Sequence, residues 1–326
     1  MEIRKIQFTG RSTYIISLPK KWVEERMLKA GDRLLIETSD SGNLTMRAEA
    51  RGDDDILIKS LEVTNLLPKE IERRVISCYL DGFDELKIIS KVRILPEQRE
   101  AILNILRRVL GAEILAETSN EVVVNDFLDM KDLPPKKVLR RMYVIVEFML
   151  KNSVQAFFSR DKILANDVIN RDEEVDKFYL LATREIIEGV KRKSGVEFDV
   201  PPEKVIHFLS IAKSLERIAD HCVKISVIVK EEEWNISGEL EKELEAFYIL
   251  VFEKLELALK SFFKGDKKLA DMTLNAKDEI HSNVSRILMK IEGKPGTLSV
   301  FTILDSFQRV YAYSTDIAEC TLDIMT

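Results

Sequence analysis

The sequence is poor in cysteine and histidine, which many disulfide-rich, zinc-binding and catalytic proteins depend on. Its 326 residues include three of each, and no two cysteines form a C-x-x-C pair. This spacing excludes a disulfide framework and a cysteine-based zinc site, and it is typical of buried thiols in a reducing compartment. The cysteines are Cys78, Cys222 and Cys320.

Long apolar runs and catalytic motifs are also missing. No stretch of eighteen apolar residues occurs, and the N-terminus lacks the shape of a signal peptide, so we expect a soluble, cytoplasmic protein without membrane insertion. There is no glycine-rich phosphate loop and no serine or cysteine nucleophile motif. A ferritin-like di-iron oxidase would need two Glu-x-x-His motifs, and the chain has only Asp278-x-x-His281. We therefore expect no enzymatic activity.

The charge is unevenly distributed. The chain has a formal net charge of −6, yet residues 1–33 carry eight Lys and Arg against four Asp and Glu. The N-terminal segment is therefore +4 and the remainder −10. A basic head on an acidic body indicates a polyanionic partner at the N-terminus.

The first predicted domain is β-rich and covers residues 1–50. We expect strands over 2–8, 12–17, 33–38 and 43–48, with a short helix over 18–28. Fifty residues with so little apolar content cannot close a core alone, so this domain predicts a homodimer.

The second predicted domain is a small α/β connecting domain over residues 51–133, which begins with a charged linker at 51–55. Strands are expected over 56–63, 85–90, 113–117 and 121–127, and helices over 68–80 and 96–110. It shows no cluster of polar side chains, and we interpret it as a spacer or dimer contact.

The third predicted domain covers residues 136–326 and contains an internal repeat. Phe157–Ala165 matches Phe262–Ala270, and Ser214–Ile218 matches Ser306–Val310. The repeats span about 136–230 and 238–325 and predict an all-α body of six helices in two three-helix bundles. The expected helices are 136–159, 161–193, 203–230, 238–263, 266–292 and 298–325.

Two pairs of carboxylates lie on helix faces that should be buried. Asp172 and Asp176 are one turn apart in one helix, and Glu216 and Asp220 are one turn apart in the next. Both pairs lie away from the polar sides of their helices. Those polar sides consist of Asn170, Glu173, Glu174, Lys177, Arg184 and Glu188, and of Ser210, Lys213, Ser214, Arg217, His221 and Lys224.

Two interpretations of these carboxylates remain open. Four carboxylates without a required histidine suit iron, manganese or magnesium better than zinc. Alternatively, Arg171, Arg217 or Lys224 turns inward and forms a buried ion-pair network. The second repeat has Lys277, His281, Gln308 and Ala312 at the matching positions, which leaves at most one metal site.

The N-terminal segment resembles the SpoVT/AbrB family of swapped-hairpin DNA-binding domains. The resemblance rests on Arg4–Gln7, Ile16–Lys20, Trp22 and Ala30–Asp32, which form an SLPK…W…GD pattern. It implies an interleaved dimer that contacts DNA phosphates through Arg4, Lys5, Arg11, Lys20 and Lys21. The alternative is a solvated charged face on a domain that only dimerises.

The body is similar to the PhoU family of phosphate-uptake regulators. The similarity rests on the three-helix repeat, on Leu215–His221 in its third helix and on Val168–Asp176 in its second. It implies a negative regulator of phosphate transport and signalling, with metal on Asp/Glu-x-x-x-Asp pairs. An AbrB-like head on a PhoU-like body resembles an archaeal arrangement and suggests a transcriptional regulator. The alternative is a module without DNA binding that modulates a phosphate transporter, its ATPase or a sensor protein.

Overall fold

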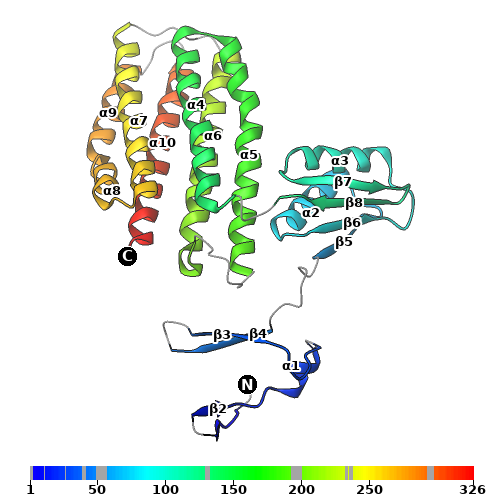
Figure 1. Cartoon of the computed structure of the whole chain (residues 1–326). Helices are drawn as coiled ribbons and strands as arrows, with labels where there is room; N and C mark the ends of the chain where they lie inside the picture. The colour runs from blue at the N-terminus through cyan, green and yellow to red at the C-terminus, as the bar shows by residue number, and fades with distance from the viewer. Residues whose placement is uncertain are drawn as a thin grey trace. The chain divides into compact units, whose positions relative to one another are not determined.

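The computed structural model divides the chain into two compact units, Met1–Ile56 and Leu57–Thr326. The residues that the structure describes are 3–10, 12–25, 27–38, 42–48, 57–128, 133–191, 200–231, 234, 238–291 and 297–326. Figure 1 shows the elements of both units. The prediction of a small β-rich N-terminal region followed by a helix-rich body is confirmed.

The N-terminal unit consists of two separate strand pairs and one short helix. Strands β1 (Gln7–Thr9) and β2 (Thr13–Ile15) are antiparallel, as are β3 (Leu34–Thr38) and β4 (Leu44–Ala48), with α1 (Lys20–Glu25) between the pairs. No residue of this unit whose burial is described is buried within the single chain. The described part of this unit therefore has no buried core within the single chain.

A small α/β domain begins the second unit. Its strands are β5 (Ile58–Glu62), β6 (Glu85–Ile89), β7 (Ala112–Glu117) and β8 (Glu121–Asp126), and its helices are α2 (Pro68–Leu80) and α3 (Pro96–Arg107).

The sheet of this domain has the order β5-β6-β8-β7. β5 and β6 are parallel, which requires the crossover that α2 supplies, and the other neighbours are antiparallel. Both helices begin with proline at the first position, where no intrahelical N–H bond is lost. The apolar residues of the helices and the sheet form one core that includes Ile71, Val75, Leu86, Ile102 and Val124.

The helical body follows the α/β domain. The described residues form α4 (Pro135–Ser159), α5 (Lys162–Lys191), α6 (Val205–Glu231), α7 (Gly238–Lys264), α8 (Lys267–Leu274), α9 (Lys277–Ile291) and α10 (Thr297–Ile324). Helices α4, α5 and α6 pack on one another, and α10 packs against α6, α7 and α8 (Figure 1). Their apolar faces form one continuous core.

The internal repeat appears in the backbone as well as in the sequence. Arg160 ends α4 with a φ of 57°, and Gly265, its counterpart in the second repeat, follows α7 with a φ of 66°. Each is followed by an aspartate, Asp161 or Asp266, that accepts backbone N–H bonds from the next helix. The two turns are thus the same structure.

One predicted helix is wrong in its extent. The expected helix over 266–292 is broken at Asn275 and Ala276, so the described body has α8 and α9 in its place. The hydroxyl of Tyr311 on α10 donates to the carbonyl of Thr273 at 3.1 Å. In a continuous helix that carbonyl would accept the N–H of Lys277; here it accepts the N–H of Ala276 at 3.3 Å and the Tyr311 hydroxyl, at the point where the helix is interrupted.

Across the described ranges, no helix has both the length and the apolar character needed to cross a bilayer.

Candidate functional site

The structure brings the four predicted carboxylates together on the adjoining faces of α5 and α6. The pKa of Asp172 is raised to about 6. Burial is the largest cause, and the negative charges of Asp176, Asp220 and Glu216 add to it. The side chain of Glu216 is 15% exposed, whereas those of Asp176 and Asp220 are 35% and 42% exposed. The cluster is therefore half-buried, and its other carboxylates disfavour the charged form of Asp172.

Cations already pair with three of these carboxylates. Asp220 lies 3.0 Å from Arg217, and Glu216 lies 2.8 Å from Lys213 and 3.6 Å from Arg217. These partners lie three residues or fewer along the same helix.

Asp176 instead pairs with Arg108, which follows α3 in the α/β domain, at 3.3 Å. Asp172 has only carboxylates as charged neighbours and no cationic partner in the part of the chain that is described. Of the three cations that the ion-pair interpretation named, Arg217 pairs with carboxylates of the cluster, and its side chain is 49% exposed. Arg171 pairs with Asp167 and Lys224 pairs with Asp305.

The arrangement does not fit a metal as it stands. Within the described residues, no three His, Cys, Asp or Glu side chains converge as metal ligands. Coordination would require Glu216 and Asp220 to exchange Lys213 and Arg217 for the ion. The prediction of iron, manganese or magnesium at this cluster stays a prediction. His221 is directed elsewhere, with its Nδ1 3.3 Å from the hydroxyl of Ser306.

A second charged cluster, which the sequence did not predict, is buried where the α/β domain meets α5. Arg184 donates to Asp126 of β8 and to Glu188 one turn further along α5, the latter at 2.8 Å. The side chain of Arg184 is 2% exposed, and those of Asp126 and Glu188 are each 5% exposed. The Arg184 guanidinium also lies over the ring of Tyr79, 4.8 Å from its centroid.

Arg184 and Glu188 belong to the predicted polar side of α5, and the structure buries both of them. The α/β domain covers the side at these two positions, whereas Asn170 and Glu173 on the same side are exposed. A Cβ atom on Gly82 would lie 2.1 Å from the Glu188 carboxylate, which shows how closely α2 and its following turn approach α5. An Arg-x-x-x-Glu pair is the same in sequence whether it is solvated or buried, so no local signal distinguished the two cases.

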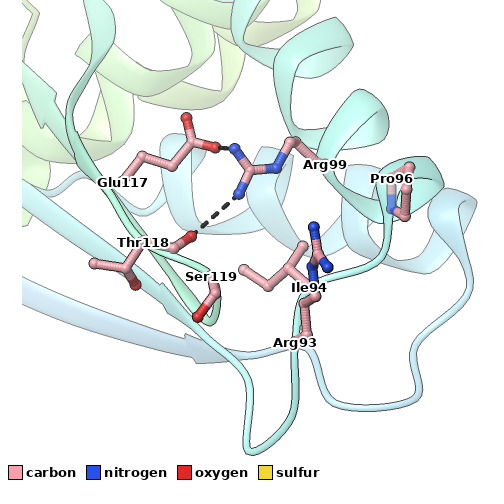
Figure 2. Close-up of a pocket in the computed structure, with 7 residues that line it drawn as sticks. All are labelled: Arg93, Ile94, Pro96, Arg99, Glu117, Thr118 and Ser119. Carbon is pink, nitrogen blue, oxygen red and sulfur yellow. Dashed lines mark hydrogen bonds and ion pairs between the residues drawn. The ribbon is translucent and has the colours of Figure 1, made fainter.

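A concavity of about 550 Å³ opens at the start of α3 (Figure 2). Arg99 pairs there with Glu117 and donates to the carbonyl of Thr118 at 3.1 Å. Arg93 forms no ion pair among the described residues, so the concavity offers one uncommitted cation. The lining residues are Arg93, Ile94, Pro96, Arg99, Glu117, Thr118 and Ser119. The cation of Arg93 and the hydroxyls of Thr118 and Ser119, in a hollow open to solvent, are too few to form a specific anion-binding site.

The predicted DNA-contacting side chains are exposed where they are described. Arg4, Lys5, Lys20 and Lys21 are exposed, and Lys20 lies 3.6 Å from Glu24 one turn along α1. Arg11 lies outside the described residues. The basic positions are thus accessible to a polyanion.

Two family models match the chain. A PhoU domain model matches residues 139–229, which span nearly all of α4 to α6 and include all four carboxylates of the cluster. Residues 139–229 are thus similar to the PhoU domain. A model described as antidote-toxin recognition MazE, bacterial antitoxin, matches residues 7–54, the range of the N-terminal strands.

The chain is also similar to proteins described as phosphate-specific transport system accessory protein PhoU homologs. The chain is 27% identical over 172 residues to the protein from Zymomonas mobilis. This alignment covers 52% of this chain and 65% of that relative. It is 34% identical over 97 residues to the protein from Caulobacter vibrioides. That alignment covers 29% of this chain and 39% of that relative. The chain thus covers less than two thirds of either relative.

Solved PhoU structures share the fold of this chain. PhoU from Pseudomonas aeruginosa superposes with a TM-score of 0.51 at 21% identity, covering 60% of this chain and 96% of that one. The regulatory protein PhoU from Streptococcus pneumoniae gives 0.52 at 16% identity, covering 60% and 95%. At these identities the likeness establishes the fold. These relatives are bacterial, and the archaeal arrangement stays a prediction.

Proposed function

We propose that the protein is a cytoplasmic, homodimeric regulator of phosphate uptake and phosphate signalling that binds DNA and acts by binding, not by catalysis. The PhoU domain and its named relatives in phosphate-specific transport systems support the regulatory role. The MazE-type unit supports contact with DNA. The helical body would respond to a metal, to phosphate or to a partner protein.

The observation that carries the DNA-binding proposal is the N-terminal unit itself. It is basic over residues 1–33, and its described residues expose large apolar side chains such as Phe8, Tyr14 and Ile36. A second copy that covers these side chains would complete a core and would place two sets of cations on one surface. Phosphates neutralised by these cations would release counterions, so binding should weaken steeply with salt.

The test is a salt-dependent titration of duplex DNA with the full chain. Lys5→Ala with Lys20→Ala should weaken binding and lower the slope of log K against log salt by about 0.9 for each phosphate that is no longer neutralised. Lys29→Ala is the matched control, because Lys29 is an exposed lysine of the same unit outside the predicted positions. An unchanged slope in the double variant would remove both lysines from the interface.

The second candidate is a module that binds a phosphate transporter, its ATPase or a sensor without touching DNA. This candidate is favoured because the relatives are described as phosphate-specific transport system accessory proteins. In that case, the Lys5→Ala, Lys20→Ala variant should regulate phosphate uptake as well as the unaltered chain does. Loss of regulation in this variant, with an unchanged dimer, would favour the DNA-binding proposal.

A further inference from the structure

Basic side chains gather at the end of the body where α4 begins and α7 ends. We call this the α4–α8 basic surface. It consists of Lys136 and Arg140 on α4, Lys264 at the end of α7, and Lys267 and Lys268 at the start of α8, and all five side chains are exposed.

Contacts across the seam between α4 and α7 show how these two helices run relative to each other. The guanidinium of Arg140 lies over the ring of Phe263, 4.2 Å from its centroid, and Lys151 lies 4.9 Å from the ring centroid of Phe252. From Arg140 to Lys151 the residue number rises by eleven, and from Phe263 to Phe252 it falls by eleven. Helices α4 and α7 are therefore antiparallel. The start of α4 therefore adjoins the end of α7 and the start of α8, at the lower end of the bundle in Figure 1.

The cations of this surface lack acidic partners within the described residues. Across 135–141 and 264–268 the one acidic residue is Asp266, and its carboxylate accepts the backbone N–H groups of Lys268 and Leu269. None of the five side chains forms an ion pair in the described part of the chain. Five exposed cations without an ion-pair partner among the described residues are unexpected in a chain with a net charge of −6.

The placement also conflicts with the helix macrodipole. The first turn of α4 contains no acidic residue and carries Lys136, whereas α8 begins at the acidic N-cap Asp266 and carries Lys267 and Lys268 after it. Helix N-termini favour anions, so lysines there are locally unfavourable. Side chains that oppose a local stability rule in this way are typical of a binding surface.

We propose that the α4–α8 basic surface is a second DNA-binding surface, which contacts the phosphate backbone of a duplex held by the N-terminal unit. The inference rests on the proposed DNA-binding function and extends it to the PhoU-type body. No large apolar side chain is exposed across 135–141 and 264–269, all of which the structure describes. A surface helix that inserts into a membrane needs such side chains, so DNA fits this surface better than a lipid bilayer does.

Two surfaces on one chain bind a long duplex with an avidity that neither has alone. Once the N-terminal unit is bound, the tethered body meets the same DNA at a high effective concentration. Because lysines contact phosphates and not base edges, the body should add affinity and salt dependence without sequence preference.

The test compares two charge-matched triple variants of the full chain on a duplex long enough to reach both surfaces. The test variant is Lys136→Gln, Lys264→Gln, Lys267→Gln. The control is Lys162→Gln, Lys230→Gln, Lys242→Gln, which removes three lysines at the start of α5, the end of α6 and the start of α7. We expect the test variant to bind at least about tenfold more weakly and to lower the salt slope by roughly 2–3, with the control unchanged.

Equal effects in both variants, or no effect in either, would overturn the second surface. If neither triple variant has an effect, weaker binding by the Lys5→Ala, Lys20→Ala variant would still uphold DNA binding by the N-terminal unit. If the unaltered chain binds no DNA, the proposed function fails together with this inference. Binding to anionic phosphatidylglycerol vesicles that the test variant alone abolishes, with DNA binding unchanged, would overturn the proposal and assign the surface to a membrane.

Discussion

Arg184 on α5 and Asp126 on β8 form a buried ion pair that joins the helical body to the α/β domain. The pair lies against Glu188 and the ring of Tyr79, and burial raises the pKa of Tyr79 to about 12. Arg108 makes a second link by pairing with Asp176. The α/β domain therefore contacts the helix that carries half of the carboxylate cluster.

The first prediction concerns this buried pair. Arg184→Ala should lower the free energy of unfolding by about 3–5 kcal/mol, because it leaves two carboxylates buried without their cation. Chemical denaturation of the full chain measures this change. Arg141→Ala is the matched control, since Arg141 pairs with Glu174 at 3.0 Å on the surface and should contribute about 0–1 kcal/mol. Equal effects of the two substitutions would contradict the buried role of Arg184.

The second prediction concerns pH and Asp172. Burial and like charges raise the pKa of Asp172 from 3.8 to about 6 in the folded chain. The folded state therefore holds this proton more tightly than the unfolded state does, and stability from this group is present below about pH 4 and lost as pH rises to about 6. Asp172→Asn should remove that loss and stabilise the chain at pH 7 by roughly 1 kcal/mol, a value reduced for solvent screening.

Denaturation curves at pH 4, 5, 6 and 7 test this expectation. The gain of the Asp172→Asn variant over the unaltered chain should grow between pH 4 and pH 6 and then stay constant. Asp167→Asn is the control, because Asp167 pairs with Arg171 in the same helix at 3.1 Å. A gain that does not depend on pH would contradict the assignment to Asp172.

The third prediction concerns metal at the carboxylate cluster. If the cluster coordinates iron, manganese or magnesium, Asp172→Asn with Glu216→Gln should abolish a stoichiometric metal measured by elemental analysis. The apo double variant should lose little stability, because Lys213 and Arg217, the cations paired with Glu216, are 40% and 49% exposed. A decrease of several kcal/mol in metal-free protein would instead identify the cluster as a structural ion-pair network.

The fourth prediction concerns the dimer. Phe8 and Tyr14 face each other across β1 and β2 with ring centroids 5.1 Å apart, and both side chains are largely exposed. If a second chain covers them, Phe8→Glu should convert a dimer of the full chain into a monomer, as measured by light scattering. Lys29→Glu is a control for added negative charge in the same unit. A full-length monomer at micromolar concentration before substitution would contradict the homodimer.

Much of the secondary structure could be predicted because its signals are local. The predicted helix over 68–80 matches α2, since Pro68 starts it and an apolar face recurs at helical spacing. The break between α8 and α9 could not be predicted in the same way, because Tyr311, whose hydroxyl bonds to Thr273 at the break, is 38 positions from Thr273 in the chain. A helix period shows where a segment can be helical, and not what a distant side chain does to its hydrogen bonds.

The sequence by itself determined the order of the parts, the repeat and the presence of four carboxylates at matching positions on neighbouring helices. Only the tertiary structure decided which charges are buried and which cations meet them. Arg184 and Glu188 follow the same spacing rule as a solvated pair, yet the α/β domain covers them; Asp172 and Asp176 are one turn apart, yet only Asp176 meets Arg108. The free energy of a charge depends on its solvation and on its neighbours in space, which the order of residues along one helix does not specify.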